Sequence, residues 1–292
     1  MRWQEGRRSS NVEDMRGFGG SSGMGGLGGL PIPIGGMRGA GLGGFGLIIF
    51  IVIALIGGFN PSQILVPSGS YNSPPAPSAN EDQLKDFISV VLADTEDVWH
   101  QQFSAMGRTY REPKLVLFSG EIDSGCGLAQ TATGPFYCPE DEKVYLDLSF
   151  MNDLAGQLGA PGDFAQAYVI AHEVGHHVQK LLGIMDRVDR SGASAKGPTG
   201  TSVRTELQAD CFAGIWAHYA DKTLGVVEPG DIDEAVNAAG AVGDDRLERE
   251  EQGYVVPDSF THGTSAQRAA WFKRGYNDGQ ISSCDTFSAS TL

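Results

Sequence analysis

The stretch that decides the fold of this chain reads Val169-Ile170-Ala171-His172-Glu173-Val174-Gly175-His176-His177-Val178-Gln179. In a helix, His172 and His176 lie four residues apart and therefore share one face. Two neutral imidazoles on one face can each direct a ring nitrogen at a single zinc ion, and Glu173 can take a proton from a metal-bound water. The pattern His-Glu-x-x-His thus predicts two metal ligands and a catalytic base.

Helix signals surround this motif. Asp163 follows Pro161-Gly162 and is expected to cap the helix, with Gln166 at the capping-box position. Gly183 is expected to end the helix. Between them, apolar residues recur at helical spacing: Phe164, Ala167, Tyr168, Ala171, Val178 and Leu182. The alternative is a chance match on a surface helix, which would have no third ligand beside it.

The third ligand is expected on a second helix, from about Ser202 to Lys222. Glu206 and Asp210 lie four apart on one face of this helix, and small residues flank them. We predict that Glu206 binds the metal and that Asp210 accepts the other ring N–H of a ligand histidine. The competing third ligands are His177, His218 and Asp210 itself.

Elements elsewhere in the chain predict a mixed α+β domain. A helix is expected to begin at a capping box of Asn80 and Gln83, and strands are expected at 114–118 and 143–150. A sheet edge near the metal helix could hold a substrate peptide by strand addition. His262 precedes a C-terminal helix capped by Thr264 and Gln267, and its imidazole could stabilise an oxyanion. A structural or exposed histidine is the alternative.

The first eighty residues differ from the rest in composition. Residues 1–41 are Gly-rich and are expected to form a disordered cytoplasmic leader, and residues 60–79 a Pro/Ser-rich tether. The uncharged apolar run at 42–59 predicts a single transmembrane helix, with a cleaved signal peptide or a buried core helix as alternatives. Arginines precede this run, so the domain at 80–292 is expected outside the cytoplasm, in the periplasm.

Charge and cysteine content narrow the function further. The formal net charge of −15 would repel nucleic acid, so no nucleic-acid partner is expected. The four cysteines fit an oxidising compartment and lack the C-x-x-C spacing of a structural zinc site. We expect disulfides between Cys126 and Cys138 and between Cys211 and Cys284, although three connectivities are possible.

The combination of His172-Glu173-x-x-His176 with Glu206-x-x-x-Asp210 resembles the gluzincin class of zinc peptidases. More closely, the chain resembles the bacterial family called putative neutral zinc metallopeptidases. Besides these motifs, the resemblance rests on segments 134–139, 144–150, 206–214 and 261–268 and on the Gly-rich leader with its apolar run. It implies a single zincin-like domain of α+β class that binds Zn²⁺.

These observations predict a zinc metallopeptidase anchored in the bacterial inner membrane by its N-terminal helix, which hydrolyses peptide bonds in a peptide or protein substrate. His172, His176 and Glu206 are the expected zinc ligands, and Glu173 is the expected base. Two alternatives stay open. One is a non-catalytic, zinc-stabilised binding module outside the cytoplasm, and the other is a zinc amidase that acts on cell-wall peptides.

Overall fold

A computed structural model describes residues 1–17, 78–130, 134–191 and 194–292 of the chain. Its main sheet has four strands in the order β1-β2-β6-β5. Strand β1 is parallel to β2, β2 is parallel to β6, and β5 is antiparallel to β6 at the edge. A separate hairpin pairs β3 with β4. The strands are β1 (Val12–Asp14), β2 (Lys114–Phe118), β3 (Glu121–Ser124), β4 (Gly127–Gln130), β5 (Phe136–Cys138) and β6 (Lys143–Asp147).

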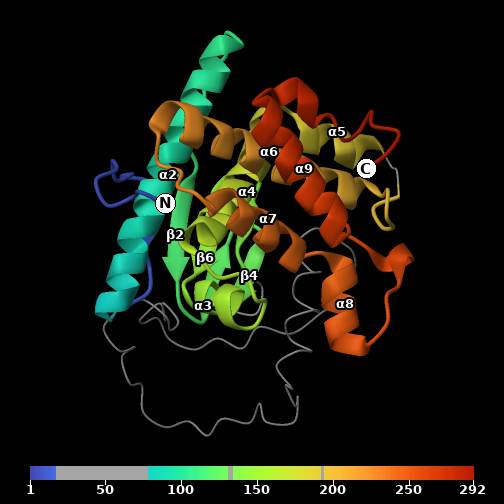
Figure 1. Ribbon diagram of the computed structural model, residues 1–292, viewed down its shortest axis with the longest axis horizontal. Coiled ribbons are helices and arrows are strands. Elements are labelled where there is room, and N and C mark those ends of the chain that lie inside the picture. The colour runs from blue at the N-terminus through green and yellow to red at the C-terminus, as the bar shows by residue number, and fades with distance from the viewer. Residues whose placement is uncertain (18–77, 131–133, 192–193) are drawn as a thin grey trace, which may run out of the picture.

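Most of the remaining described chain is helical, and Figure 1 shows the long α2 beside strand β2. The helices are α2 (Ala79–Ala105), α3 (Ser149–Gly156), α4 (Asp163–Leu181), α5 (Ile184–Ser191), α6 (Thr201–Tyr219), α7 (Asp231–Ala241), α8 (Asp244–Gln252) and α9 (Ser265–Asp278). Short helical turns are η3 (Ala220–Leu224), η4 (Pro257–Ser259) and η5 (Ile281–Cys284).

The core of the domain is built around α4 and α6, which cross at close range. At Gly175 of α4 an added Cβ would lie 3.0 Å from the Ala209 carbonyl oxygen of α6, so a glycine lets the two backbones approach. The rings of Phe164 and Trp216 stack between the same helices, with centroids 5.3 Å apart. Helix α9 packs on the other side of α6. The two helices predicted to carry the metal ligands are therefore held in direct contact.

The structure confirms some of the predicted helix caps and corrects others. The capping box of Thr264 and Gln267 is confirmed at the start of α9. Helix α2 is instead capped by Ser78 with Glu81, two residues before the predicted cap at Asn80. The predicted cap at Asp163 is wrong, because Gly162 occupies that position without a side-chain hydrogen bond.

A side chain from another helix accepts a hydrogen bond from the start of α4. The backbone N–H of Phe164 donates to Oε2 of Glu234 in α7, at 3.1 Å. Local spacing could not reveal this partner, because it lies 70 residues away in the chain.

The two predicted strands are present as β2 and β6, although β6 ends at Asp147 rather than Phe150. There the Asp147 side chain accepts the backbone N–H of Ser149 at 2.9 Å, and the chain turns into α3. Both predicted disulfides are confirmed. Cys126–Cys138 ties the β3–β4 turn to β5, and Cys211–Cys284 ties α6 to η5.

The N-terminal segment corrects the predicted membrane topology. Residues 42–59, the predicted membrane helix, and residues 60–77 of the tether lie outside the described residues. One span at 42–59 would place the segments before and after it on opposite sides of a membrane. Instead β1 pairs in register with β2, and Ser9 and Asn11 hydrogen-bond to Glu96 of α2.

In Figure 1 this N-terminal segment, drawn in blue, runs along α2. The prediction of a cytoplasmic leader joined by one span to a domain outside the inner membrane is therefore wrong. The predicted fold class is correct as α+β but not in its N-terminal transmembrane helix. Within residues 1–17, 78–130, 134–191 and 194–292, no helix has the length and apolar character needed to cross a membrane.

Candidate active site

Three predicted metal ligands converge where α4 meets α6. One ligand atom from each of His172, His176 and Glu206 lies within 4.8 Å of the other two. The Nε2 atom of His172 is 3.2 Å from Oε2 of Glu206, and the Nε2 atom of His176 is 3.5 Å from Oε1 of the same residue. Two imidazole nitrogens and one carboxylate, with room for a fourth partner, are the donor set typical of catalytic zinc sites.

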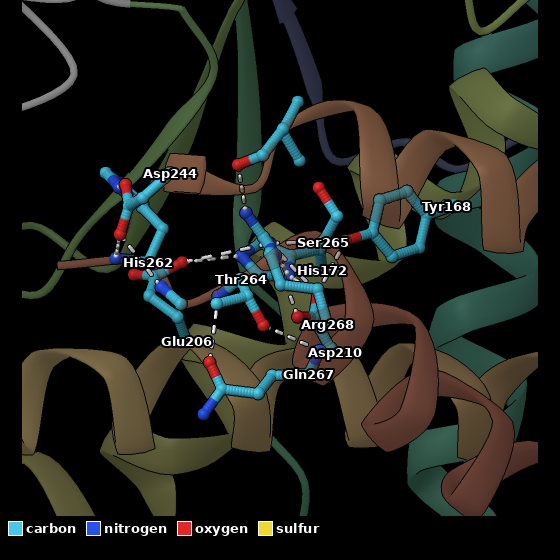
Figure 2. Close-up of polar contacts among 12 residues, drawn as sticks. Tyr168, His172, Glu206, Asp210, Asp244, His262, Thr264, Ser265, Gln267 and Arg268 are labelled. Carbon is cyan, nitrogen blue, oxygen red and sulfur yellow. Dashed lines mark hydrogen bonds and ion pairs between the residues drawn. The ribbon is translucent and has the colours of Figure 1, made fainter. Parts of the chain in front are cut away.

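The outer nitrogen of His172 is held by Asp210, as the sequence predicted. Nδ1 of His172 lies 2.8 Å from Oδ1 of Asp210, which also accepts a hydrogen bond from the Tyr168 hydroxyl. Arg268 of α9 donates from Nε and Nη2 to the two oxygens of Asp210, both at 2.9 Å. Figure 2 shows Arg268 and Tyr168 arranged around Asp210 behind His172. This arrangement fixes Nδ1–H on His172 and leaves Nε2 for a metal.

The outer nitrogen of His176 has a neutral partner. Its Nδ1 lies 2.9 Å from Oε1 of Gln179, three residues later on the same helix. Gln179 is completely buried. Both histidines therefore direct Nε2 toward Glu206, and the residues present fit a zinc ion.

Neighbouring charges shift the pKa values of Glu206 and His172. Burial opposes ionisation of Glu206, but the charges and hydrogen bonds of His176 and His172 hold the pKa of Glu206 well below its ordinary value. Burial also lowers the pKa of His172, but Asp210 and Glu206 outweigh burial and raise it to about 10. A cation bound at Nε2 must therefore displace a proton from this ring.

Glu173 lies in the wall of a cavity of about 280 Å³ that also exposes His172, His176 and Glu206. Burial is the main cause that raises the pKa of Glu173 above its ordinary value. Most of the cavity surface is apolar, and its apolar lining includes Phe136, Phe150, Leu158, Val169, Val242 and Leu247. Phe136 comes from β5, so the edge strand of the sheet borders the cavity.

His262 lies in the same cavity wall, in the loop before α9. Its Nδ1 is 3.0 Å from Oδ1 of Asp244, and Oδ2 of Asp244 accepts the backbone N–H groups of Thr261, His262 and Gly263. Burial lowers the pKa of His262, but the hydrogen bond to Asp244 and the charges of Glu206 and Asp244 outweigh burial and raise it. Figure 2 shows His262 between Asp244 and Glu206.

The competing third ligands lie elsewhere or have another role. His177 is turned away from the site, with Nδ1 3.1 Å from the Tyr137 hydroxyl and Nε2 2.6 Å from the Arg111 carbonyl oxygen. His218 lies 2.6 Å from the carbonyl oxygen of Tyr276. Asp210 faces the outer nitrogen of His172. Glu206 is therefore the carboxylate that meets both Nε2 atoms.

A second group of carboxylates, Asp163, Asp231 and Glu234, also lies within 4.8 Å among the described residues. The α-ammonium group of Met1 lies 2.7 Å from Asp163 and 3.4 Å from Asp231. A cation of the protein itself thus pairs with two members of this group, and we assign no metal to it.

Sequence reasoning missed three residues of the site. Gln179 and Tyr168 share the helix face of the ligands, three residues after His176 and four before His172, so helical spacing carried a signal for both. Arg268 carried no such signal, because it lies 96 residues from His172 and reaches the site only through the packing of α9.

Comparison with known proteins agrees with this geometry. Residues 1–287 match the family described as "Putative neutral zinc metallopeptidase". "Uncharacterized protein YpfJ" of Escherichia coli strain K12 is 51% identical over 294 residues, covering 99% of this chain and 100% of that protein. "Uncharacterized protein Rv2575" of Mycobacterium tuberculosis strain H37Rv is 48% identical over 193 residues, covering 63% of this chain and 65% of that protein.

No solved structure matches the chain. The family match spans nearly all of the sequence and includes the segments that bring His172, His176 and Glu206 together. The chain therefore belongs to the putative neutral zinc metallopeptidase family.

Proposed function

We propose that this protein is a zinc-dependent metallopeptidase in which His172, His176 and Glu206 hold the ion and Glu173 acts as the base. The observation that carries the proposal is the convergence of both Nε2 atoms on Glu206, in a cavity whose wall also contains Glu173. A purely structural zinc site closes its fourth position with another protein ligand and has no need of a base. This arrangement therefore favours catalysis over a binding module.

Zinc bound at these three residues would supply a Lewis acid that polarises the scissile carbonyl and lowers the pKa of the attacking water. Glu173 removes a proton from that water as its oxygen adds to the carbonyl carbon. The same carboxyl group then gives the proton to the amine nitrogen as the C–N bond breaks. Its buried position and raised pKa suit a group that must both take up and release a proton.

His262 supplies the second function that the reaction needs. An oxyanion forms on the carbonyl oxygen during the addition, and a cationic or N–H-donating group beside it lowers the barrier. Asp244 holds Nδ1 of His262, so Nε2 is the nitrogen available to donate. We propose that His262 donates this hydrogen bond to the oxyanion.

The cavity indicates the substrate class. Its lining is mostly apolar, so it favours a peptide or protein substrate that places an apolar side chain next to the cleaved bond. Strand β5 at the cavity border could pair with the extended substrate backbone by strand addition. The net charge of −15 disfavours nucleic acid as a partner.

A panel of quenched fluorescent peptides tests the proposal. The panel would vary one position through apolar, acidic and basic residues and would include peptidoglycan fragments. We expect hydrolysis of peptides with apolar residues, loss of hydrolysis after zinc is removed with a chelator, and recovery when zinc is restored. Cleavage of peptidoglycan fragments alone would contradict a general peptidase and support an amidase. Hydrolysis that survives metal removal would contradict the zinc mechanism.

A further inference from the structure

The two ligand histidines are oriented by different chemistry. His172 has the ionised carboxylate of Asp210 behind it, whereas His176 has the amide of Gln179. An amide side chain presents either an oxygen or an NH₂ group to its neighbour, so by itself it does not determine which imidazole nitrogen carries the proton. Something further must fix the orientation of the Gln179 amide.

The fixed orientation comes from a chain of buried hydrogen bonds. Gln179 Nε2 donates to the Thr205 carbonyl oxygen at 2.8 Å and to Oε1 of Gln208 at 3.1 Å. Gln208 Nε2 in turn donates to the Cys284 carbonyl oxygen at 2.9 Å. Gln179 and Cys284 are completely buried and Gln208 is 5% exposed, so water does not replace these partners.

The Cys284 carbonyl, at the end of these hydrogen bonds farthest from His176, determines which groups donate and which accept. The Cys284 carbonyl can only accept, so Gln208 must turn its NH₂ group toward it and its oxygen toward Gln179. Gln179 must then direct its NH₂ group at Gln208 and at the Thr205 carbonyl, which also can only accept. The Gln179 oxygen is left facing His176, so Nδ1 of His176 carries the proton and Nε2 keeps its lone pair for the metal.

The outer end of the chain is anchored covalently. Cys284 belongs to η5 near the C-terminus, and its disulfide to Cys211 joins η5 to α6, the helix that carries Glu206 and Gln208. The disulfide therefore holds the Cys284 carbonyl at a fixed place relative to Gln208. Thr205, the other acceptor, directly precedes Glu206.

We propose that Gln179 and Gln208 are positioning residues that fix the tautomer of His176, and that the Cys211–Cys284 disulfide anchors their hydrogen-bond chain. This inference rests on the metal site of the proposed function, but it concerns the affinity of that site rather than the reaction. It assigns a share in metal binding to a disulfide that contributes no metal ligand.

The test measures two quantities on the full chain. The first is the zinc dissociation constant, from competition with a chromogenic chelator at fixed pH. The second is the tautomer of His176, from the ring nitrogen chemical shifts in NMR of the metal-free protein with Glu206→Ala, because the Glu206 carboxylate 3.5 Å from Nε2 would otherwise compete for the proton. Neither readout requires hydrolysis. A wild type that binds zinc but cleaves nothing would therefore overturn the proposed function and leave this inference standing, and the tautomer decides the inference even if zinc does not bind.

Gln179→Met removes the acceptor for Nδ1–H while it keeps a side chain of similar length. We expect zinc affinity to fall about 10- to 100-fold, as for loss of other partners of ligand histidines, and His176 to populate both tautomers. Gln157→Met is the matched control, because Gln157 is the exposed C-cap of α3 and its side chain donates to Asp153 of that helix.

Gln208→Met tests the second link, and we expect a smaller loss of affinity in the same direction. The Cys211→Ala/Cys284→Ala variant tests the anchor, with Cys126→Ala/Cys138→Ala as the control disulfide. If the anchor acts through Gln208, combining Gln208→Met with loss of the disulfide should cost little more than either change alone.

Three results would overturn the inference. One is a Gln179→Met variant whose zinc affinity and His176 tautomer match those of the wild type. Another is a Gln208→Met variant whose zinc affinity and His176 tautomer match those of the wild type. The third is fully additive losses from Gln208→Met and disulfide removal, which would separate the anchor from the chain. If the disulfide variant does not fold, the glutamine variants decide the outcome.

Discussion

Arg268 meets Asp210 through two hydrogen bonds of 2.9 Å, with both side chains almost completely removed from water. Burial opposes ionisation of Asp210, but the charges of Arg268 and His172 keep its pKa below the ordinary value. The partner of a ligand histidine is thus held as an anion by a residue from a third helix. Figure 2 shows this connection between α9 and the metal ligands.

Replacement of Arg268 by methionine would leave Asp210 charged and without its cationic partner. Breaking a buried ion pair on one side costs about 3–5 kcal/mol, so we expect a free energy of unfolding lower by about that amount. Urea unfolding of the metal-free protein measures it. Arg8→Met is the control, because its ion pair with Asp86 is exposed to water and should leave the midpoint nearly unchanged. Equal effects of the two variants would contradict this account of Arg268.

Loss of the His262 ring should affect the reaction and spare the metal. In the His262→Ala variant we expect kcat to fall about 10²- to 10³-fold, the usual cost of one oxyanion donor, with zinc content unchanged. Steady-state kinetics and metal analysis on one preparation measure both. His100→Ala serves as the control, because His100 is exposed and pairs with Glu112. Undiminished turnover in His262→Ala would show that His262 has no part in the chemistry.

Asp94 of α2 should make stability depend on pH. Burial and the nearby charge of Asp97 raise the pKa of Asp94 to about 7, and its Oδ2 has no hydrogen-bond partner among the described residues. A raised carboxyl pKa means that the folded state prefers the protonated form. Stability is therefore lost as pH rises from about 4 to about 7, and the loss is complete above that range.

Asp94→Asn removes this penalty. At pH 8 we expect the variant to be more stable than the wild type by up to about 4 kcal/mol, with the difference vanishing near pH 4. Urea unfolding at several pH values gives the profile, and Asp233→Asn, at an exposed site on α7, should show no such profile. A wild-type advantage at pH 8 would contradict the assignment.

Gly275 of α9 should tolerate no side chain. A Cβ at this position would overlap the carbonyl oxygen of Cys211 in α6, and a backbone atom cannot move aside as a flexible side chain can. We expect Gly275→Ala to lower the free energy of unfolding by about 1–3 kcal/mol or more. Gly156→Ala is the matched control, because a Cβ there meets nothing within 4 Å. An equally stable Gly275→Ala variant would mean that α6 and α9 are less closely packed than described.

The parts of the site that sequence could predict are those encoded by helical spacing. His172, His176, Glu206 and Asp210 each lie four residues from a partner on the same helix, so one pattern places each pair on one face. The strand at 114–118 was predicted with its bounds because a run of four apolar residues, 115–118, lies between Lys114 and Ser119. The pairing of the four cysteines followed the expected default.

What sequence could not predict depends on contacts between distant segments. Arg268 and the Glu234 cap of α4 act across 58 and 70 residues, and no local pattern marks them. The prediction for the N-terminal segment was wrong because the apolar run at 42–59 indicated a membrane span between this segment and the rest of the domain. The pairing of Val12–Asp14 with β2 became visible only in the assembled sheet.

The central claim is that Glu173 is the base of a zinc peptidase, and the most direct test is zinc content measured together with peptide hydrolysis in wild type and Glu173→Gln. The account predicts one zinc ion per chain in both proteins, with hydrolysis in the wild type and none in the variant, because the amide cannot take up the proton of the attacking water. Glu206→Ala, assayed beside them, should lose the zinc. Hydrolysis retained by Glu173→Gln at the wild-type rate would contradict the account.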